Sequence, residues 1–281
     1  MAMRAFVLSG VLTLLVLSGC DSGDGGGAPT PLTPAFPTAV PADPQAVFDQ
    51  WKDIVSNPEK AKDDTLYAQL AWELRDREPA MIGKMVDMLV DPQTKPESRF
   101  LILGSLEVCH TPDMYPRLLE LTKPEVDPAI RTGVVIMLKS ADDPAVEARL
   151  RELTNDPERR VRLAALSVLS EKGDKPSRAT IQEYYFTDGL PPEHRAQIIR
   201  TLALAPEAAD IKIFSVAVND ESLAEEPRFI STGALRQIGD PAGIPALQLC
   251  ADTANSPTLK SAAANAVKML ENKVSTGPAS E

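Results

Sequence analysis

Hydrophobic residues return at helical spacing through most of the chain, and the pattern repeats at intervals of 31 to 33 residues. A basic residue marks every unit after the first, and an apolar residue follows it seven positions later, in most units with another at the fourth position. Offsets of four and seven lie on one face of an α-helix, so each unit is predicted to begin with an amphipathic helix. The basic column is Arg99, Arg131, Arg162, Arg195, Arg228 and Lys260, and the apolar column is Leu106, Leu138, Leu169, Leu202, Leu235 and Val267.

A second apolar segment with helical spacing follows the first in each unit. Prolines and aspartates separate the segments, as expected where proline occupies a first helical turn and aspartate caps it. A helix over residues 42–55 would cover the first unit, and the last unit ends after one helix near Lys273. The chain is therefore predicted to be all-α, a right-handed α-solenoid of about six helical pairs with terminal caps. The second helices are predicted at 81–89, 115–121, 146–153, 179–186, 211–218 and 244–249.

The repeat sequence resembles HEAT repeats of the short bacterial, phycobilin-lyase-like type. The likeness is clearest where Asp156-Pro157 is followed by Val161-Arg162 and then by alanine and leucine up to Leu169. It covers residues 57–274 and is weakest in the first unit, where Tyr67 replaces the basic residue. The resemblance implies the fold and assigns the solenoid to residues 45–274. It does not imply one function, because such arrays serve as scaffolds, peptide binders and enzyme accessories.

The first 19 residues read as an export signal. A short segment with one arginine precedes the apolar run 5–17, which is too short to span a bilayer as a helix. The following Leu17-Ser18-Gly19-Cys20 resembles the lipobox of bacterial lipoproteins, which implies a lipid on the Cys20 thiol and cleavage before it. The alternative is an ordinary secretory signal with an incidental cysteine.

Residues 20–44 form the predicted lipid anchor and a linker, rich in glycine and then in proline, while residues 275–281 form a predicted disordered tail. Asp21 follows the lipid-bearing cysteine, a position where aspartate tends to retain lipoproteins in the inner membrane of enteric bacteria. We therefore expect a cell-envelope protein held at the periplasmic face of the inner membrane.

The charge and composition of the chain limit the classes of partner that it is expected to bind. The chain has 40 acidic and 29 basic residues, a formal net charge of -11, which repels nucleic acid. Its low aromatic content, 5% against 43% hydrophobic residues, favours helices packed by small aliphatic side chains.

Few motifs in the sequence are typical of catalytic sites. The chain is therefore expected not to be an enzyme and to use no cofactor or metal. Cys109-His110 with Asp113 could contribute metal ligands, but their spacing matches no zinc pattern. The deoxyhypusine-hydroxylase branch of HEAT proteins binds iron through repeated His-Glu pairs, and this chain has two histidines and no such dipeptide. His194 occupies a mostly apolar register position and is expected to be half-buried.

The three consecutive aromatic residues Tyr184, Tyr185 and Phe186 are the candidate partner-binding site. A helix cannot bury three consecutive bulky side chains on one stripe, so at least one is expected to be exposed. The alternative is that all three pack between repeats. The basic column is expected to bond to inter-repeat loops, and the acidic residues of 220–226 either attract a basic segment or calcium, or form a solvated loop.

These features predict a membrane-anchored, non-catalytic scaffold that binds a protein or peptide through its repeat surface. The alternative is an accessory or chaperone-like subunit of an enzyme, with a lyase-type helper as its extreme form. Cys109 and Cys250 lie four units apart in the repeat register, so they are expected to be free thiols even in an oxidising compartment.

Overall fold

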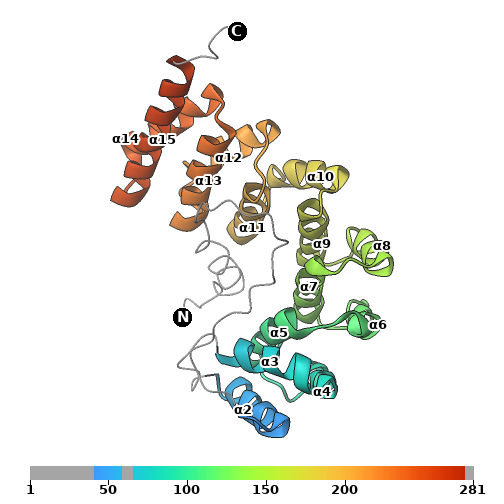
Figure 1. Ribbon diagram of the computed structural model, residues 1–281. Helices are drawn as coiled ribbons and strands as arrows, with labels where there is room; N and C mark the ends of the chain where they lie inside the picture. The colour runs from blue at the N-terminus through green and yellow to red at the C-terminus, as the bar shows by residue number, and fades with distance from the viewer. Residues whose placement is uncertain (1–40, 59–65, 276–281) are drawn as a thin grey trace, which may run out of the picture. The chain divides into compact units, whose positions relative to one another are not determined.

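Helices account for the regular secondary structure of the computed structural model, which describes residues 41–58 and 66–275 (Figure 1). No strand occurs within these ranges, and the predicted all-α class of paired HEAT-like helices is confirmed. The chain divides into two compact units, residues 1–138 and residues 139–281. Cys20, most of the proposed linker and nearly all of the C-terminal tail lie outside the described residues.

Unit 1 begins with a helix that covers the first repeat. The Trp51 side chain of this helix is fully buried, and its indole N–H donates to the Ser105 hydroxyl at 2.8 Å. This first helix packs against the first helices of the next two pairs. Gly133 permits close packing further along, because a Cβ there would lie 2.4 Å from a Leu103 methyl group. The helices are α2 (Pro44–Ser56), α3 (Leu66–Arg77), α4 (Pro79–Val90), α5 (Pro96–Cys109), α6 (Tyr115–Glu120) and α7 (Pro128–Met137).

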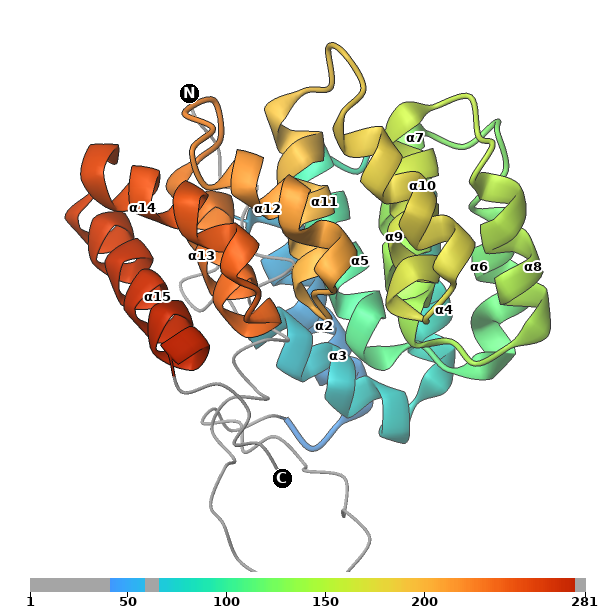
Figure 2. The same ribbon diagram turned by 90° about the horizontal axis from the view of Figure 1, so that it is seen from above.

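Unit 2 repeats the same arrangement. Its helices are α8 (Pro144–Leu153), α9 (Arg159–Glu171), α10 (Lys175–Tyr185), α11 (Pro192–Ala203), α12 (Ile211–Ala217), α13 (Glu225–Ile238), α14 (Ile244–Thr253) and α15 (Pro257–Ser275). The first helices α9, α11, α13 and α15 are successive neighbours, and α12 lies beside α14 (Figure 2). One layer therefore consists of first helices and the other of second helices, as in repeat proteins generally.

The helix starts follow the signals in the sequence. Asp127, Asp143 and Asp174 are N-caps, whose carboxylates accept backbone N–H bonds at 2.7, 2.8 and 2.9 Å. Proline follows the cap within the first turn of α7, α8 and α10, where its missing N–H costs no hydrogen bond.

The basic column stabilises the loops between helices, as the sequence predicted. Most of its members donate to a main-chain carbonyl in the loop before their own helix, for example Arg131 to Pro124 at 2.7 Å and Arg162 to Pro157 at 2.8 Å. Arg195 differs, because its guanidinium contacts Asp220 and Ser222 in the loop after α12, which leads to the next repeat. Arg195 also lines both hollows of the candidate functional site.

Cys109 and Cys250 are free and buried, in agreement with the expectation for these thiols. Burial raises the pKa of Cys109 to about 12 and also raises the pKa of Cys250. Because the thiolate is the reactive form, we expect both to resist N-ethylmaleimide in the native chain and to react fully after denaturation. Peptide-resolved mass spectrometry separates their labelling from that of Cys20. A disulfide-linked pair of peptides containing both residues would contradict the structure.

Candidate functional site

The three candidate aromatic residues at the end of α10 have different surroundings. Tyr185 is 3% exposed and belongs to the hydrophobic core of unit 2. Tyr184 is half-buried, and its hydroxyl accepts a long hydrogen bond from Arg162 at 3.4 Å. Phe186, the C-cap of α10, is 44% exposed. The expectation that at least one of the three is exposed therefore holds, and Phe186 is the most exposed of them.

Phe186 lies at the edge of a small recess. Its ring meets Tyr185 edge to face, with 5.2 Å between the centroids, and the Lys212 ammonium lies 4.8 Å from the Phe186 centroid. The loop 187–190 forms one wall of the recess, and Arg195 and Val216 close it. This side recess has a volume of about 330 Å³.

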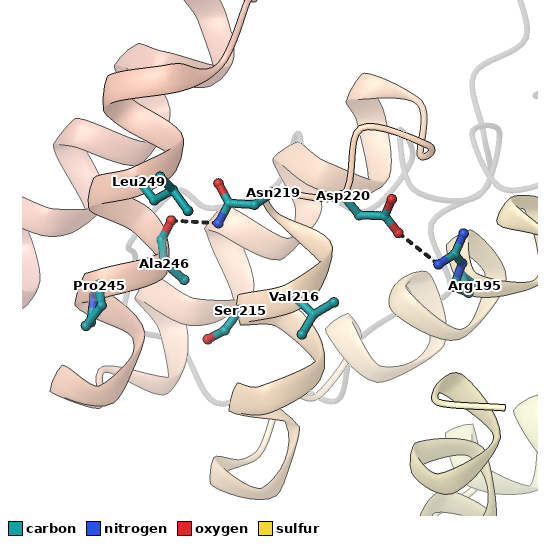
Figure 3. A pocket seen from close by; sticks show the side chains of 8 residues that line it. All are labelled: Arg195, Ser215, Val216, Asn219, Asp220, Pro245, Ala246 and Leu249. Carbon is teal, nitrogen blue, oxygen red and sulfur yellow. Dashed lines mark hydrogen bonds and ion pairs between the residues drawn. The ribbon is translucent and has the colours of Figure 1, made fainter. Parts of the chain in front are cut away.

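A larger hollow adjoins the side recess and shares Arg195 and Val216 with it. This α12–α14 groove is an open depression of about 610 Å³ between the two second helices for which it is named (Figure 3). Its lining residues are Arg195 from α11, Ser215, Val216, Asn219 and Asp220 from α12 and the loop after it, and Pro245, Ala246 and Leu249 from α14.

The wall of the groove is apolar where solvent exposure is greatest. Val216 is 46% exposed and Leu249 is 51% exposed, and both line the same hollow. The Asn219 amide, in the turn after α12, donates to the Ala246 carbonyl oxygen of α14 at 3.0 Å and so links these two neighbouring elements (Figure 3).

Val216 and Leu249 occupy one column of the repeat, 21 positions after the basic residue of their units. The three preceding units carry Glu120, Glu152 and Glu183 at this position, and all three glutamates are exposed. Glutamate suits a solvent-facing helical position, whereas valine and leucine expose apolar surface there. The exchange from glutamate to aliphatic residues occurs in two successive repeats, which are the two that form the groove.

An ion pair closes one end of the groove. Arg195 Nη1 lies 3.0 Å from Asp220 Oδ2, in an ion pair that lacks hydrogen-bond alignment, and the side chains are 25% and 15% exposed. Ser222 also donates its N–H and its hydroxyl to the other Asp220 oxygen, at 3.0 and 2.6 Å. Burial, with a smaller contribution from Asp220, raises the pKa of Tyr185 to about 12. The phenol therefore stays neutral.

The two histidines that the sequence singled out line neither the groove nor the side recess. His194 is half-buried as expected, and burial lowers its pKa, an effect that Glu193 opposes. The His110 Nδ1 atom lies 2.8 Å from the Leu106 carbonyl oxygen. No cluster of three or more histidine, cysteine, aspartate or glutamate side chains with metal-binding geometry occurs within residues 41–58 and 66–275.

Some of the acidic side chains of residues 220–226 accept hydrogen bonds from other residues of unit 2. Glu226 accepts two hydrogen bonds from Arg200, at 2.9 and 2.6 Å, and Glu225 accepts one from the Ser256 hydroxyl at 2.5 Å. Glu221 is exposed. Within the described residues, no helix has the length and apolar character needed to span a membrane.

Comparison with known proteins finds similarity at the level of fold. No protein-family model matches the chain, and the search of curated proteins finds no relative. Among solved structures, the chain is similar to human deoxyhypusine hydroxylase in complex with glycerol, with 19% identity and a TM-score of 0.38. The similarity covers 82% of this chain and 90% of the hydroxylase chain.

This comparison corrects the expectation that the chain is not an enzyme. That expectation is wrong as a conclusion from the sequence, because the solved structure with a similar helical fold is an enzyme. At this level of identity the similarity concerns the fold alone and assigns no activity to the chain.

Of the residues that the sequence singled out, Tyr185 and Phe186 line the side recess and Asp220 lines the larger groove, whereas the apolar pair Val216 and Leu249 was not predicted. A signal for the groove was present in the repeat alignment, in the column that changes from glutamate to Val216 and Leu249. This column faces solvent, whereas apolar residues are expected in the buried columns of the repeat.

Proposed function

We propose that this chain is a lipid-anchored protein of the bacterial cell envelope and that its α12–α14 groove binds a segment of a partner protein. The observation that carries the binding proposal is the pair Val216 and Leu249, both about half exposed in one hollow. Isolated exposed apolar residues are common on protein surfaces, whereas apolar residues gathered in a depression are typical of binding sites.

The shape of the groove favours a protein segment over a small molecule. Ligand pockets usually enclose most of the ligand surface, and this depression lies open along two helices. Repeat proteins commonly use such extended surfaces to bind other chains. If the partner is an enzyme recovered in fixed stoichiometry, the role is that of an accessory or chaperone-like subunit, of which a lyase-type helper is one form.

Changing the apolar pair tests the binding proposal. We expect Val216→Gln combined with Leu249→Gln to reduce partner recovery from solubilised membranes at least about tenfold, equivalent to about 1.4 kcal/mol. Glutamine has the shape of the glutamate found in the preceding repeats but adds no charge. Val90→Gln is the matched control, because Val90 is 42% exposed and lies in unit 1. Equal recovery by the double variant and the control would refute the assignment of the groove.

The anchor is supported by the lipobox-like Leu17-Ser18-Gly19-Cys20 after the apolar run. We expect Cys20→Ser to abolish incorporation of radioactive palmitate and to leave the chain unprocessed or released from the membrane. Continued labelling of the serine variant would contradict the anchor. Asp21 further supports retention in the inner membrane, and recovery of the wild-type chain in outer-membrane fractions of a sucrose gradient would count against that location.

A further inference from the structure

Carboxylates without ion-pair partners border the groove and the side recess. Asp188 lines the recess, Glu183 lies one helical turn before Phe186, and Glu221 follows the groove residue Asp220. All three side chains are exposed, and none of them has an ion pair within the described part of the chain. Asp252, further along α14, has a neighbouring base, because the Lys260 ammonium contacts its carbonyl oxygen at 3.3 Å.

Some exposed carboxylates elsewhere in the described residues do have ion-pair partners. On α8, the exposed carboxylates Glu147 and Glu152 are both paired with arginines of the same helix, at 2.8 and 2.6 Å. Around the groove, Arg195 is already paired with Asp220, and Lys212 is held over the Phe186 ring. The exposed carboxylates Glu183, Asp188 and Glu221 therefore outnumber the one exposed lysine, Lys212, beside this apolar surface.

We infer that the segment bound by the α12–α14 groove is basic as well as apolar, with aliphatic side chains that contact Val216 and Leu249 and lysine or arginine that faces Glu183, Asp188 and Glu221. This inference rests on the proposed binding function and specifies the chemistry of the partner. Complementary charge raises the association rate and excludes acidic competitors, while the buried apolar contact supplies most of the affinity.

Two designed peptides test the inference, one an amphipathic leucine–lysine helix and the other a leucine–glutamate helix of the same pattern. The whole chain is placed in nanodiscs of neutral phosphatidylcholine, and binding is measured by fluorescence anisotropy against empty nanodiscs. We expect the leucine–lysine peptide to bind at least about tenfold more tightly at low salt, and this difference to shrink at high salt.

Two variants separate the charge from the groove. Glu183→Gln with Asp188→Asn and Glu221→Gln is expected to remove the preference for the lysine peptide, and Val216→Gln with Leu249→Gln is expected to weaken both peptides. The neutral substitution Val90→Gln should change neither. Equal binding of the two peptides to the wild-type chain, or a lysine preference that survives the neutralising variant, would overturn the charge inference. If the charge inference failed in this way but Val216→Gln with Leu249→Gln still reduced recovery of the native partner, the proposed binding function would stand without the charge inference.

Discussion

Replacing Asp210 with alanine is expected to lower the free energy of unfolding of unit 2 by about 3–5 kcal/mol. Asp210 is fully buried between α10 and α12, and its carboxylate accepts a hydrogen bond from the Arg178 guanidinium. It also accepts from the Gln182 amide at 2.6 Å and from the Glu207 backbone N–H at 2.8 Å. The alanine variant would leave a nearly buried arginine without its carboxylate, together with two unsatisfied donors.

The neighbouring Glu207 supplies the control. Its carboxylate lies 3.4 Å from the same guanidinium, but the side chain is 62% exposed, so solvent screens the pair. We expect Glu207→Gln to change stability by less than about 0.5 kcal/mol. Because a chain with two units need not unfold in one step, peptide-resolved hydrogen exchange of α10 and α12 is the appropriate measurement. An Asp210→Ala variant whose α10 and α12 exchange as slowly as in the wild type would contradict the prediction.

A compensating pair of substitutions tests the cause of the loss. Arg178→Met combined with Asp210→Leu removes both charges and retains much of the volume. Since buried ion pairs seldom stabilise more than well-packed apolar residues of similar size, we expect the double variant to recover most of the lost stability. A double variant as unstable as Asp210→Ala would show that packing around the aspartate, rather than the unpaired arginine, is responsible.

Truncating the seventh-position leucines is expected to have an effect of similar size. Leu169 and Leu202 are 1% and 0% exposed, on the first helices α9 and α11. Leucine to alanine at either position should cost about 2–5 kcal/mol, from lost burial and from the cavity that remains. Each repeat contacts mainly its neighbours, so the loss should begin locally and broaden the unfolding transition in urea.

Leu204 is a close control for Leu202, because it follows two residues later and is 67% exposed. We expect Leu204→Ala to stay within about 0.5 kcal/mol of the wild type, as is usual for surface positions. Circular dichroism during urea titration measures all three variants. Losses below about 0.5 kcal/mol at both Leu169 and Leu202 would show that the repeat register is wrong.

The sequence by itself determined the paired helices and, in most repeats, the buried side of the first helix. A basic residue followed by apolar positions four and seven predicted first helices, and Val135, Leu166 and Ile199 in the fourth-position column are buried. Proline and aspartate located the helix starts, as at Asp143 before α8. These features were predictable because helical periodicity and capping depend on residues a few positions apart.

The local pattern could not decide which of three adjacent aromatic residues would be buried. Tyr184, Tyr185 and Phe186 have similar apolar area, and helical spacing limited only how many could share one stripe. The choice depends on where α10 ends and on the neighbours beyond it, with Tyr185 in the core and Phe186 beside Lys212. Lys212 belongs to another helix of unit 2, α12.

The tertiary structure alone decided the polar contacts and the groove. Asp210 has no aspartate at the matching position of the other repeats, so nothing in the periodicity indicated a buried carboxylate bonded to Arg178. Arg195 matches the rest of its column in sequence, yet it pairs with Asp220 instead of a preceding carbonyl. Periodicity records which face of a helix is buried. The partner of a polar group, and the depth of a hollow between two helices, depend on side chains about 30 positions apart that are brought together only by packing.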